Sequence, residues 1–219
     1  MRLLLALLTL LLLPAPAQAG PWPREAQGWF LATSMGQERV GAARQTFGDL
    51  YAEYGATGRL TLATQLRHIP GGWRGDLIAR FHPQPAGFAL PFGLSAGTRF
   101  QPGRADRVLL LFGAHLGQGF DTRAGNLWAR LDMQMHTRPA QLTNPVELSL
   151  SGQLGFRSAR GLLGMVSLTG KRRNGVSRLE LAPAIGHEIG RGHTLVLGLT
   201  AASHSRGLTS ARLALWSRF

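Results

Sequence analysis

The chain has 219 residues, no cysteine and a formal net charge of +13, with 24 lysine and arginine residues against 11 aspartate and glutamate residues. The absence of cysteine excludes disulfides, thiol chemistry and a lipid anchor on cysteine. A charge of this size would suggest a nucleic-acid partner in a cytoplasmic protein. The N-terminus predicts secretion instead, so we expect no nucleic acid, and arginines that meet lipopolysaccharide phosphates or attract anions into a lumen.

Residues 1–19 show the three regions of a secretory signal peptide in the right order. Arg2 supplies the positive charge, residues 3–13 form an apolar run interrupted only by Thr9, and Ala17 and Ala19 are small residues before a cut at Gly20. This run is too short to span a membrane, and the alternative is a buried N-terminal helix. We therefore predict a cleaved signal peptide, 1–19, followed by a single domain, 20–219.

The rest of the chain alternates apolar and polar residues with a period of two, which is typical of β-strands. It contains no stretch of 18 apolar residues, and its longest uninterrupted aliphatic and aromatic run is 108–112. The alternation predicts about twelve strands, most of them near the roughly 9 to 11 residues that a tilted membrane strand needs. The predicted strands are 28–35, 46–54, 60–68, 74–82, 88–100, 108–120, 126–136, 146–157, 162–171, 176–187, 193–202 and 208–219.

A chain that crosses a membrane with strands must close its sheet, because unpaired strand edges cannot be hydrated in lipid. The predicted fold is therefore all-β: a transmembrane antiparallel β-barrel of about twelve strands, monomeric and surrounded by outer-membrane lipid and lipopolysaccharide. A soluble sandwich or lipocalin-like barrel is the alternative, and it would bury the apolar faces inside.

The even strand count places both termini on the periplasmic side. Gly-containing segments at 55–58 and 189–192 predict tight turns on that side. The segments 36–45 and 137–145 predict longer loops on the outer side. Short periplasmic turns with longer outer loops are the usual asymmetry of such barrels.

One face of each strand is polar and carries charges of both signs, which predicts the side that faces the lumen. These charges either plug the interior with salt bridges or line a narrow aqueous path, and a barrel of about twelve strands lies between the filled small barrels and the water-filled large ones. The predicted lumen set is Asp49, Glu53, Gln65, Arg67, Asp76, Arg80, Arg99, His115, Arg130, Asp132, Gln134, His136, Glu147, Gln153, Arg178, Glu180 and Arg212.

The chain ends on an aromatic residue that closes an alternating strand. Leu213, Leu215 and Phe219 share its apolar face. This pattern resembles the C-terminal signature by which bacterial outer-membrane barrels are recognised for insertion, which implies the barrel-assembly machinery as a partner. Ser217 departs from the signature, which usually has an apolar residue two positions before the end.

A second resemblance lies in residues 50–62, LYAEYGATGRLTL, where an acidic residue and a tyrosine precede a glycine turn and a basic-Leu-Thr-Leu restart. This segment is similar to the strand, turn and strand of small proteobacterial outer-membrane barrels, including those associated with the meta-pathway of phenol degradation. The resemblance implies an outer-membrane channel or transporter-like barrel and brings no catalytic residues.

Three motifs suggest chemistry. Residues 93–97 match the G-x-S-x-G nucleophile elbow, but the elbow needs a strand that turns into a helix, and here strand alternation continues through the motif. His187 and Glu188 begin like a zinc-protease motif, but Arg191 replaces the second histidine. His204 and Ser205 lie in a predicted outer loop, where neighbouring side chains point to opposite faces.

From these motifs we expect no catalytic site, no cofactor and no metal. The sequence leaves three functions open: a narrow passive channel or transporter-like barrel for small solutes, a structural or surface-interaction barrel with a plugged lumen, and, as the most distant, an outer-membrane lipid-modifying hydrolase.

Overall fold

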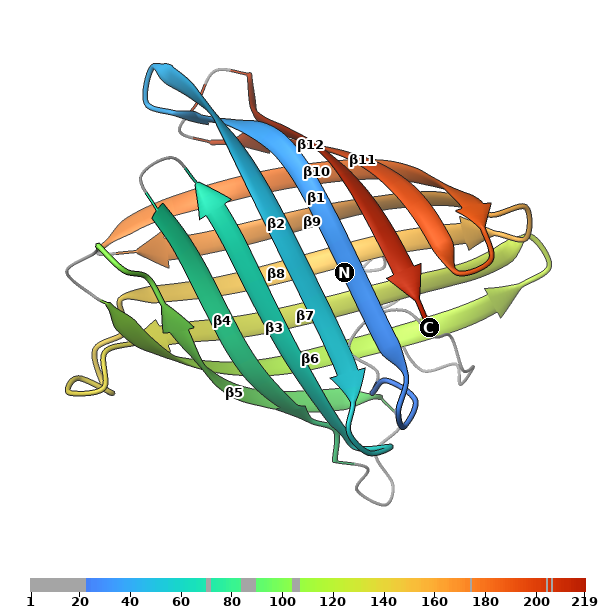
Figure 1. Cartoon of the computed structure of the whole chain (residues 1–219), viewed down its shortest axis with the longest axis horizontal. Helices are drawn as coiled ribbons and strands as arrows, with labels where there is room; N and C mark the ends of the chain where they lie inside the picture. The colour runs from blue at the N-terminus through green and yellow to red at the C-terminus, as the bar shows by residue number, and fades with distance from the viewer. Residues whose placement is uncertain are drawn as a thin grey trace, which may run out of the picture.

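The computed structural model describes residues 23–69, 72–83, 90–103, 107–173, 175–203, 205 and 207–219. Within these residues the strands form one closed antiparallel barrel, in which each strand pairs with the next along the chain and the first pairs with the last (Figure 1). The strands are β1 (Trp29–Val40), β2 (Ala43–Gly55), β3 (Leu60–Ile69), β4 (Gly72–Phe81), β5 (Phe92–Phe100), β6 (Val108–Thr122), β7 (Gly125–Thr137), β8 (Glu147–Ser158), β9 (Leu162–Arg173), β10 (Val176–Gly190), β11 (His193–Ala202) and β12 (Leu208–Arg218).

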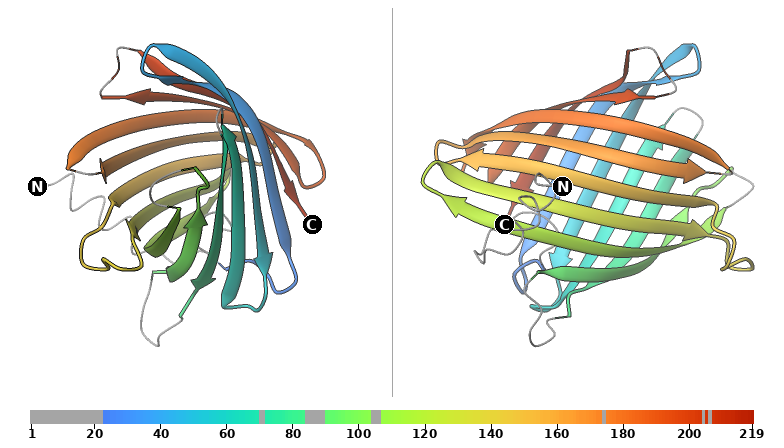
Figure 2. Two further views of the ribbon diagram at one scale, coloured as in Figure 1. Left: turned by 60° about the vertical axis from the view of Figure 1, so that its left-hand side comes forward. Right: turned by 180° about the vertical axis from the view of Figure 1, so that it is seen from behind.

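The strands are strongly tilted, so that β1 to β4 cross β6 to β10 of the opposite wall at a large angle (Figures 1 and 2). Such tilt is what closure of a sheet into a barrel requires. The predicted fold class is confirmed, and all twelve predicted strands are present in the described residues. The predicted signal peptide, 1–19, lies outside the described residues and stays a prediction.

The first hairpin corrects one expected loop. The segment 36–45 is not a long loop, because β1 continues to Val40 and β2 begins at Ala43. Gly41 has a φ of 62°, a left-handed conformation that glycine adopts without steric cost and that a two-residue hairpin turn requires. The polar residues that suggested a loop, such as Gln37 and Glu38, instead pair with Thr46 and Gln45 in the sheet.

The expected asymmetry of the connections is also only partly present. We call the end of the barrel where β1 begins and β12 ends the terminal end. The connection 82–91 between β4 and β5 lies at the terminal end and is longer than most connections at the opposite end. Pro83, Pro85 and Pro91 fall in it, and proline has no backbone N–H for a strand ladder. The predicted strand 88–100 accordingly starts late, at Phe92, and residues 88 and 89 lie outside the described part.

The described residues contain no helix that is long and apolar enough to cross a membrane.

The outer face of the barrel is apolar. Leu77, Leu131, Leu150 and Ile185 point outward and are exposed, and they alternate with the polar residues of the interior. Aromatic residues lie near both ends of this face: Trp29 and Tyr54 stack with ring centroids 4.7 Å apart at the terminal end, and Trp73 and Phe100 lie toward the opposite end. An apolar band with aromatic residues at its borders is typical of a membrane barrel, so the soluble alternative is wrong.

The C-terminus closes the seam between β1 and β12. The backbone N–H groups of Trp29 and Phe219 each donate to the other residue's carbonyl, at 3.0 and 3.1 Å. The Phe219 ring is exposed, as are Leu213 and Leu215 on the same outer face. Ser217, which departs from the usual signature, hydrogen-bonds through its Oγ to His193 Nδ1 at 3.0 Å. A polar residue at this position therefore has a partner on the neighbouring strand.

The interior has one apolar wall, which the polar alternation does not predict. The residues of this wall come from β7 and from β9 to β12 and are Trp128, Leu163, Met165, Ala184, Val196, Ala214 and Trp216. β11 and the end of β12 carry apolar residues on both faces, so alternation alone distinguishes inside from outside poorly there.

Trp128 lies flat against Gly155 of the neighbouring strand, and this contact gives a first prediction. A Cβ atom at position 155 would be 2.1 Å from Trp128 Cζ2, so Gly155→Ala must displace the buried indole. We expect a loss of about 1–3 kcal/mol, measured as a lower temperature at which the folded band disappears from a gel of detergent-extracted protein.

Gly152→Ala in the same strand is the matched control, because a Cβ atom there meets nothing within 4 Å. Equal shifts for the two variants would contradict the packing of Trp128 on Gly155.

Candidate functional site

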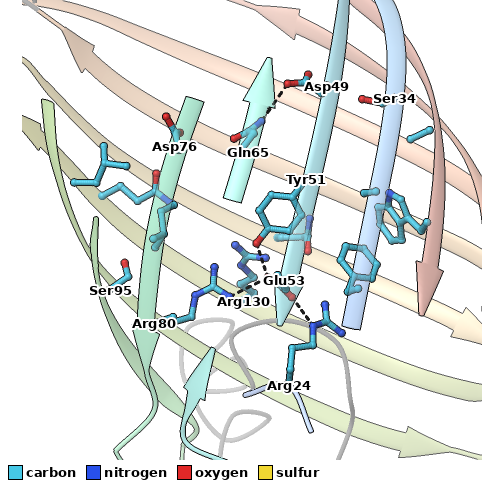
Figure 3. A pocket seen from close by; sticks show the side chains of 18 of the residues that line it. Arg24, Ser34, Asp49, Tyr51, Glu53, Gln65, Asp76, Arg80, Ser95 and Arg130 are labelled. Atoms are coloured by element: carbon cyan, nitrogen blue, oxygen red, sulfur yellow. Dashed lines mark hydrogen bonds and ion pairs between the residues drawn. The ribbon is translucent and has the colours of Figure 1, made fainter. Parts of the chain in front are cut away.

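The barrel encloses a cavity of about 410 Å³. It extends from Arg24 and Arg218 at the terminal end to Asp49 and Arg212 near the middle of β2 and β12. Part of its wall is polar and belongs to β2 to β8 (Figure 3), and part is the apolar wall described above. The charged residues that line it among the described residues are six arginines, Arg24, Arg80, Arg99, Arg130, Arg212 and Arg218, and three carboxylates, Asp49, Glu53 and Asp76.

Glu53 holds together the terminal end of the cavity. Its carboxylate accepts hydrogen bonds from Arg24 Nε, from the Tyr51 hydroxyl and, at 3.1 Å, from Arg80 Nη1 (Figure 3). Arg24 precedes β1, and its backbone N–H donates to Thr61 Oγ1 at 3.1 Å. The segment before the first strand is therefore fastened inside the terminal mouth by a charged side chain and a backbone bond.

A second group of charges begins at Asp49 on the cavity wall and extends toward the opposite end. Arg67 donates to Glu38 at 2.6 Å and to Asp49 at 3.2 Å. Its guanidinium group also stacks on the Phe47 ring, 4.2 Å from the centroid. Gln65 adds a hydrogen bond to Asp49 at 3.2 Å. These contacts link side chains of β1, β2 and β3 inside the lumen.

A third group links β4, β5, β7, β8 and β9. Arg99 binds both oxygens of Asp76 at 2.8 Å in the bidentate geometry that guanidinium and carboxylate favour. His136 lies between Arg99, at 3.2 Å, and Glu147, at 3.3 Å. Arg173 approaches the same Glu147 at 3.9 Å.

A fourth group joins β5, β6 and β7. His115 Nδ1 lies 2.7 Å from Asp132 Oδ1, and His115 Nε2 lies 2.9 Å from Ser95 Oγ. Arg130 Nε donates to the other oxygen of Asp132. His115 is 2% exposed and Asp132 is 7% exposed, whereas Ser95 lines the cavity.

Some arginines of the interior have no carboxylate within 4.0 Å among the described residues. Examples are Arg212 and Arg218, both on the cavity wall, and Arg74 of β4. A guanidinium group that faces a cavity without a protein carboxylate beside it is available to an anion.

The strand registers place the whole predicted lumen set on the interior side of its strands. Five further members make side-chain contacts inside the barrel without lining the cavity, and these are Arg67, His115, Asp132, Glu147 and Glu180. Arg178 is exposed near the end of β10, away from the cavity. The members that line the cavity itself are Asp49, Glu53, Gln65, Asp76, Arg80, Arg99, Arg130, Gln134, His136, Gln153 and Arg212.

Sequence reasoning missed several residues of this site. Arg74 is the first residue of the predicted strand 74–82 and alternates with Asp76 and Arg80, so the same periodicity places it on the interior face although the predicted lumen set omits it. Arg218 likewise alternates with Arg212 in the last strand and is missing from the set. Arg24 lies before the first strand, so no periodicity places it, and its contacts with Glu53 and Thr61 show that it enters the lumen.

His187 and Glu188 belong to β10, and Glu188 pairs with Arg157 at 3.4 Å. No group of three or more metal-ligand side chains occurs among the described residues. His204 lies outside that part of the chain, and the Ser203 hydroxyl accepts a hydrogen bond from the backbone N–H of Leu179 at 3.1 Å.

No protein-family model and no curated protein matches the sequence. Solved structures do match. A KdgM porin gives a TM-score of 0.65 at 8% identity over 87% of this chain and 99% of that one, and a NanC porin gives 0.63 at 8% over 85% and 97%. The COG4313 outer-membrane channel of Pseudomonas putida F1 gives 0.54 at 11% over 94% and 100%.

The fold is that of small outer-membrane channels. At these identities the likeness concerns the fold, and the apolar exterior adds that this barrel lies in an outer membrane. The chemistry of the lumen must be read from this chain's own residues.

Proposed function

We propose that the protein is a narrow passive channel for small organic anions. The observation that carries this proposal is the arginine excess of the cavity wall, where Arg212 and Arg218 have no carboxylate within 4.0 Å among the described residues. Charges that line a low-dielectric path concentrate ions of the opposite sign and set selectivity. The apolar wall around Trp128 and Trp216 offers contact area to the carbon skeleton of such an anion.

The class of solute is supported by one of the similar structures. A KdgM porin with this fold has been solved in complex with oligogalacturonate, at a TM-score of 0.58 and 7% identity. Galacturonate carries a carboxylate, which is the group that the arginines of this lumen would bind. A phenol-related solute rests only on the resemblance in residues 50–62.

A plugged structural barrel is the second candidate, and the closing contacts favour it. Arg24 and Glu53 bridge the terminal mouth, while Arg67 and Phe47 stack toward the opposite end. In either case we propose a monomer that contacts lipid and lipopolysaccharide and is inserted by the barrel-assembly machinery through its C-terminal strand.

Single-channel conductance in planar bilayers tests the channel, and it gives our second prediction. The wild type should conduct and should prefer chloride over potassium in a salt gradient. Arg212→Glu should lower the chloride-to-potassium permeability ratio to parity or below, because it places a carboxylate on the cavity wall.

Arg172→Glu is the matched control, because it changes the net charge equally but lies on the outward-facing register of β9. An equal change of selectivity in both variants would contradict the proposed role of the lumen charge. A folded wild-type barrel that does not conduct would support the plugged alternative.

A further inference from the structure

Three residues of neighbouring strands form a Ser-His-Asp relay inside the lumen. Ser95 Oγ lies 2.9 Å from His115 Nε2, and His115 Nδ1 lies 2.7 Å from Asp132 Oδ1. A nucleophile, a base and an orienting carboxylate in this order are the parts of a serine hydrolase, which is recognised by geometry and not by position in the sequence. The relay therefore has the connectivity that hydroxyl activation requires.

The serine is more accessible than the histidine and the aspartate. Ser95 is on the cavity wall, whereas His115 and Asp132 are nearly inaccessible to solvent. Arg130 holds the second oxygen of Asp132, so the carboxylate has a fixed orientation toward the imidazole. Of the three, the serine lines the cavity, and the base lies directly behind it.

A glycine between the strands leaves the space that the relay needs. Gly113 is opposite Ser95 in the register of β5 and β6. A Cβ atom at this position would be 2.6 Å from Ser95 Oγ and 3.2 Å from His115 Nε2. A larger residue would push the hydroxyl away from the imidazole, so the absence of a side chain permits their hydrogen bond.

A cationic donor lies beside the serine. The backbone N–H groups of a strand are used in the sheet, so charge on a substrate oxygen must be stabilised here by a side chain. Arg80 is opposite Ser95 in the register of β4 and β5 (Figure 3). Its side chain lines the cavity, and its Nε has no hydrogen-bond partner among the described residues.

We propose that the lumen hydrolyses carboxylic esters of small organic anions, with Ser95 as nucleophile, His115 as base, Asp132 as the residue that orients it and Arg80 as the oxyanion donor. This activity goes beyond the proposed channel. The anionic substrate class rests on the proposed anion preference, whereas the assignment of the nucleophile does not.

The reaction balances with water as the second reactant. Ser95 Oγ forms a bond to the ester carbonyl carbon while its proton moves to His115 Nε2, and the C–O bond to the alcohol then breaks as the imidazolium returns that proton to the departing oxygen. Water attacks the acyl-serine with its proton passing to His115. The carboxylic acid leaves and the serine regains its hydrogen.

A fluorophosphonate probe tests the nucleophile on the purified full-length barrel in detergent. Attack by Ser95 Oγ forms an O–P bond and expels fluoride, and mass spectrometry should find the adduct on the peptide that contains Ser95. Ser95→Ala should abolish it, and His115→Gln should slow labelling by about 100-fold or more, the usual contribution of a general base.

Ser151→Ala is the matched control, because Ser151 hydrogen-bonds to Thr169 Oγ1 at 2.8 Å and has no imidazole beside it. The Ser151→Ala barrel should form the adduct on Ser95 as fast as the wild type does. If His115→Gln does not fold, Ser95→Ala, which removes one hydroxyl group, decides the result. A folded wild type without an adduct on Ser95, or with equal adducts on Ser151, would overturn the proposal.

A pair of chromogenic esters tests the substrate class. The anionic 4-nitrophenyl hemisuccinate should be hydrolysed with a lower KM than the neutral 4-nitrophenyl acetate, and Arg212→Glu should remove this difference. Equal KM values in the wild type would overturn the anionic class. Labelling of Ser95 in a barrel that conducts no ions would support the nucleophile while contradicting the channel.

Discussion

Replacing Leu131 by arginine should strongly reduce insertion of the barrel, whereas replacing its neighbour Arg130 by leucine should leave insertion largely intact. Leu131 lies in the middle of β7, points outward and is 44% exposed. Arginine there places a charge in lipid, at a cost of about 2–4 kcal/mol near the bilayer midplane. Arg130 points inward and binds Asp132, so its loss affects the charge network of the lumen.

The amount of folded protein in outer-membrane fractions, followed by the difference in gel migration before and after boiling, measures this effect. The two positions are adjacent, so general fragility of β7 cannot produce opposite outcomes. Equal yields, or yields in the reverse order, would show that the inner and outer faces of this strand are exchanged.

Glu53→Gln should be the most destabilising single change in the lumen network. The Glu53 side chain is 8% exposed and neutralises Arg24 and Arg80, of which Arg80 is 10% exposed. Glutamine keeps the shape but leaves the buried Arg80 without its counter-charge. Removal of one partner of a buried ion pair costs about 3–5 kcal/mol, which should appear as a lower midpoint of urea unfolding followed by tryptophan fluorescence.

Glu180→Gln is the control for this change. Its partner Lys171 lies 2.7 Å away, but the pair is considerably more exposed, with side chains 38% and 20% accessible, and such pairs contribute about 0–1 kcal/mol. A second variant, Glu53→Gln combined with Arg80→Leu, should recover part of the stability because it removes the uncompensated cation. If Glu53→Gln and Glu180→Gln shift the midpoint alike, the Glu53 network does not stabilise the barrel.

Segment 93–97 shows which features of the site the sequence predicts and which it does not. Alternation correctly placed it in a strand with Ser95 facing inward, and the absence of a helix correctly argued against a nucleophile elbow. The hydrogen-bond partner of Ser95 could not be read from this segment. His115 and Asp132 each lie on a different strand, and the sequence alone does not say how far each strand is shifted against its neighbour.

The sequence by itself determined the number of strands, their antiparallel order and the direction of most side chains. It could do so because the alternation of faces along a strand is local and has a period of two residues. Leu213 and Leu215 on one outward face, and Leu131 outside with Arg130 and Asp132 inside, follow from that period alone.

Only the tertiary structure decided which interior residues meet. Closure of the sheet and the shift of each strand against the next bring Arg24 to Glu53, His115 to Ser95, and Trp128 to Gly155. These contacts depend on register and on the tilt of the whole barrel, which no single strand encodes. The balance of paired and unpaired arginines, on which the proposed anion preference rests, is likewise a property of the closed barrel and of no segment within it.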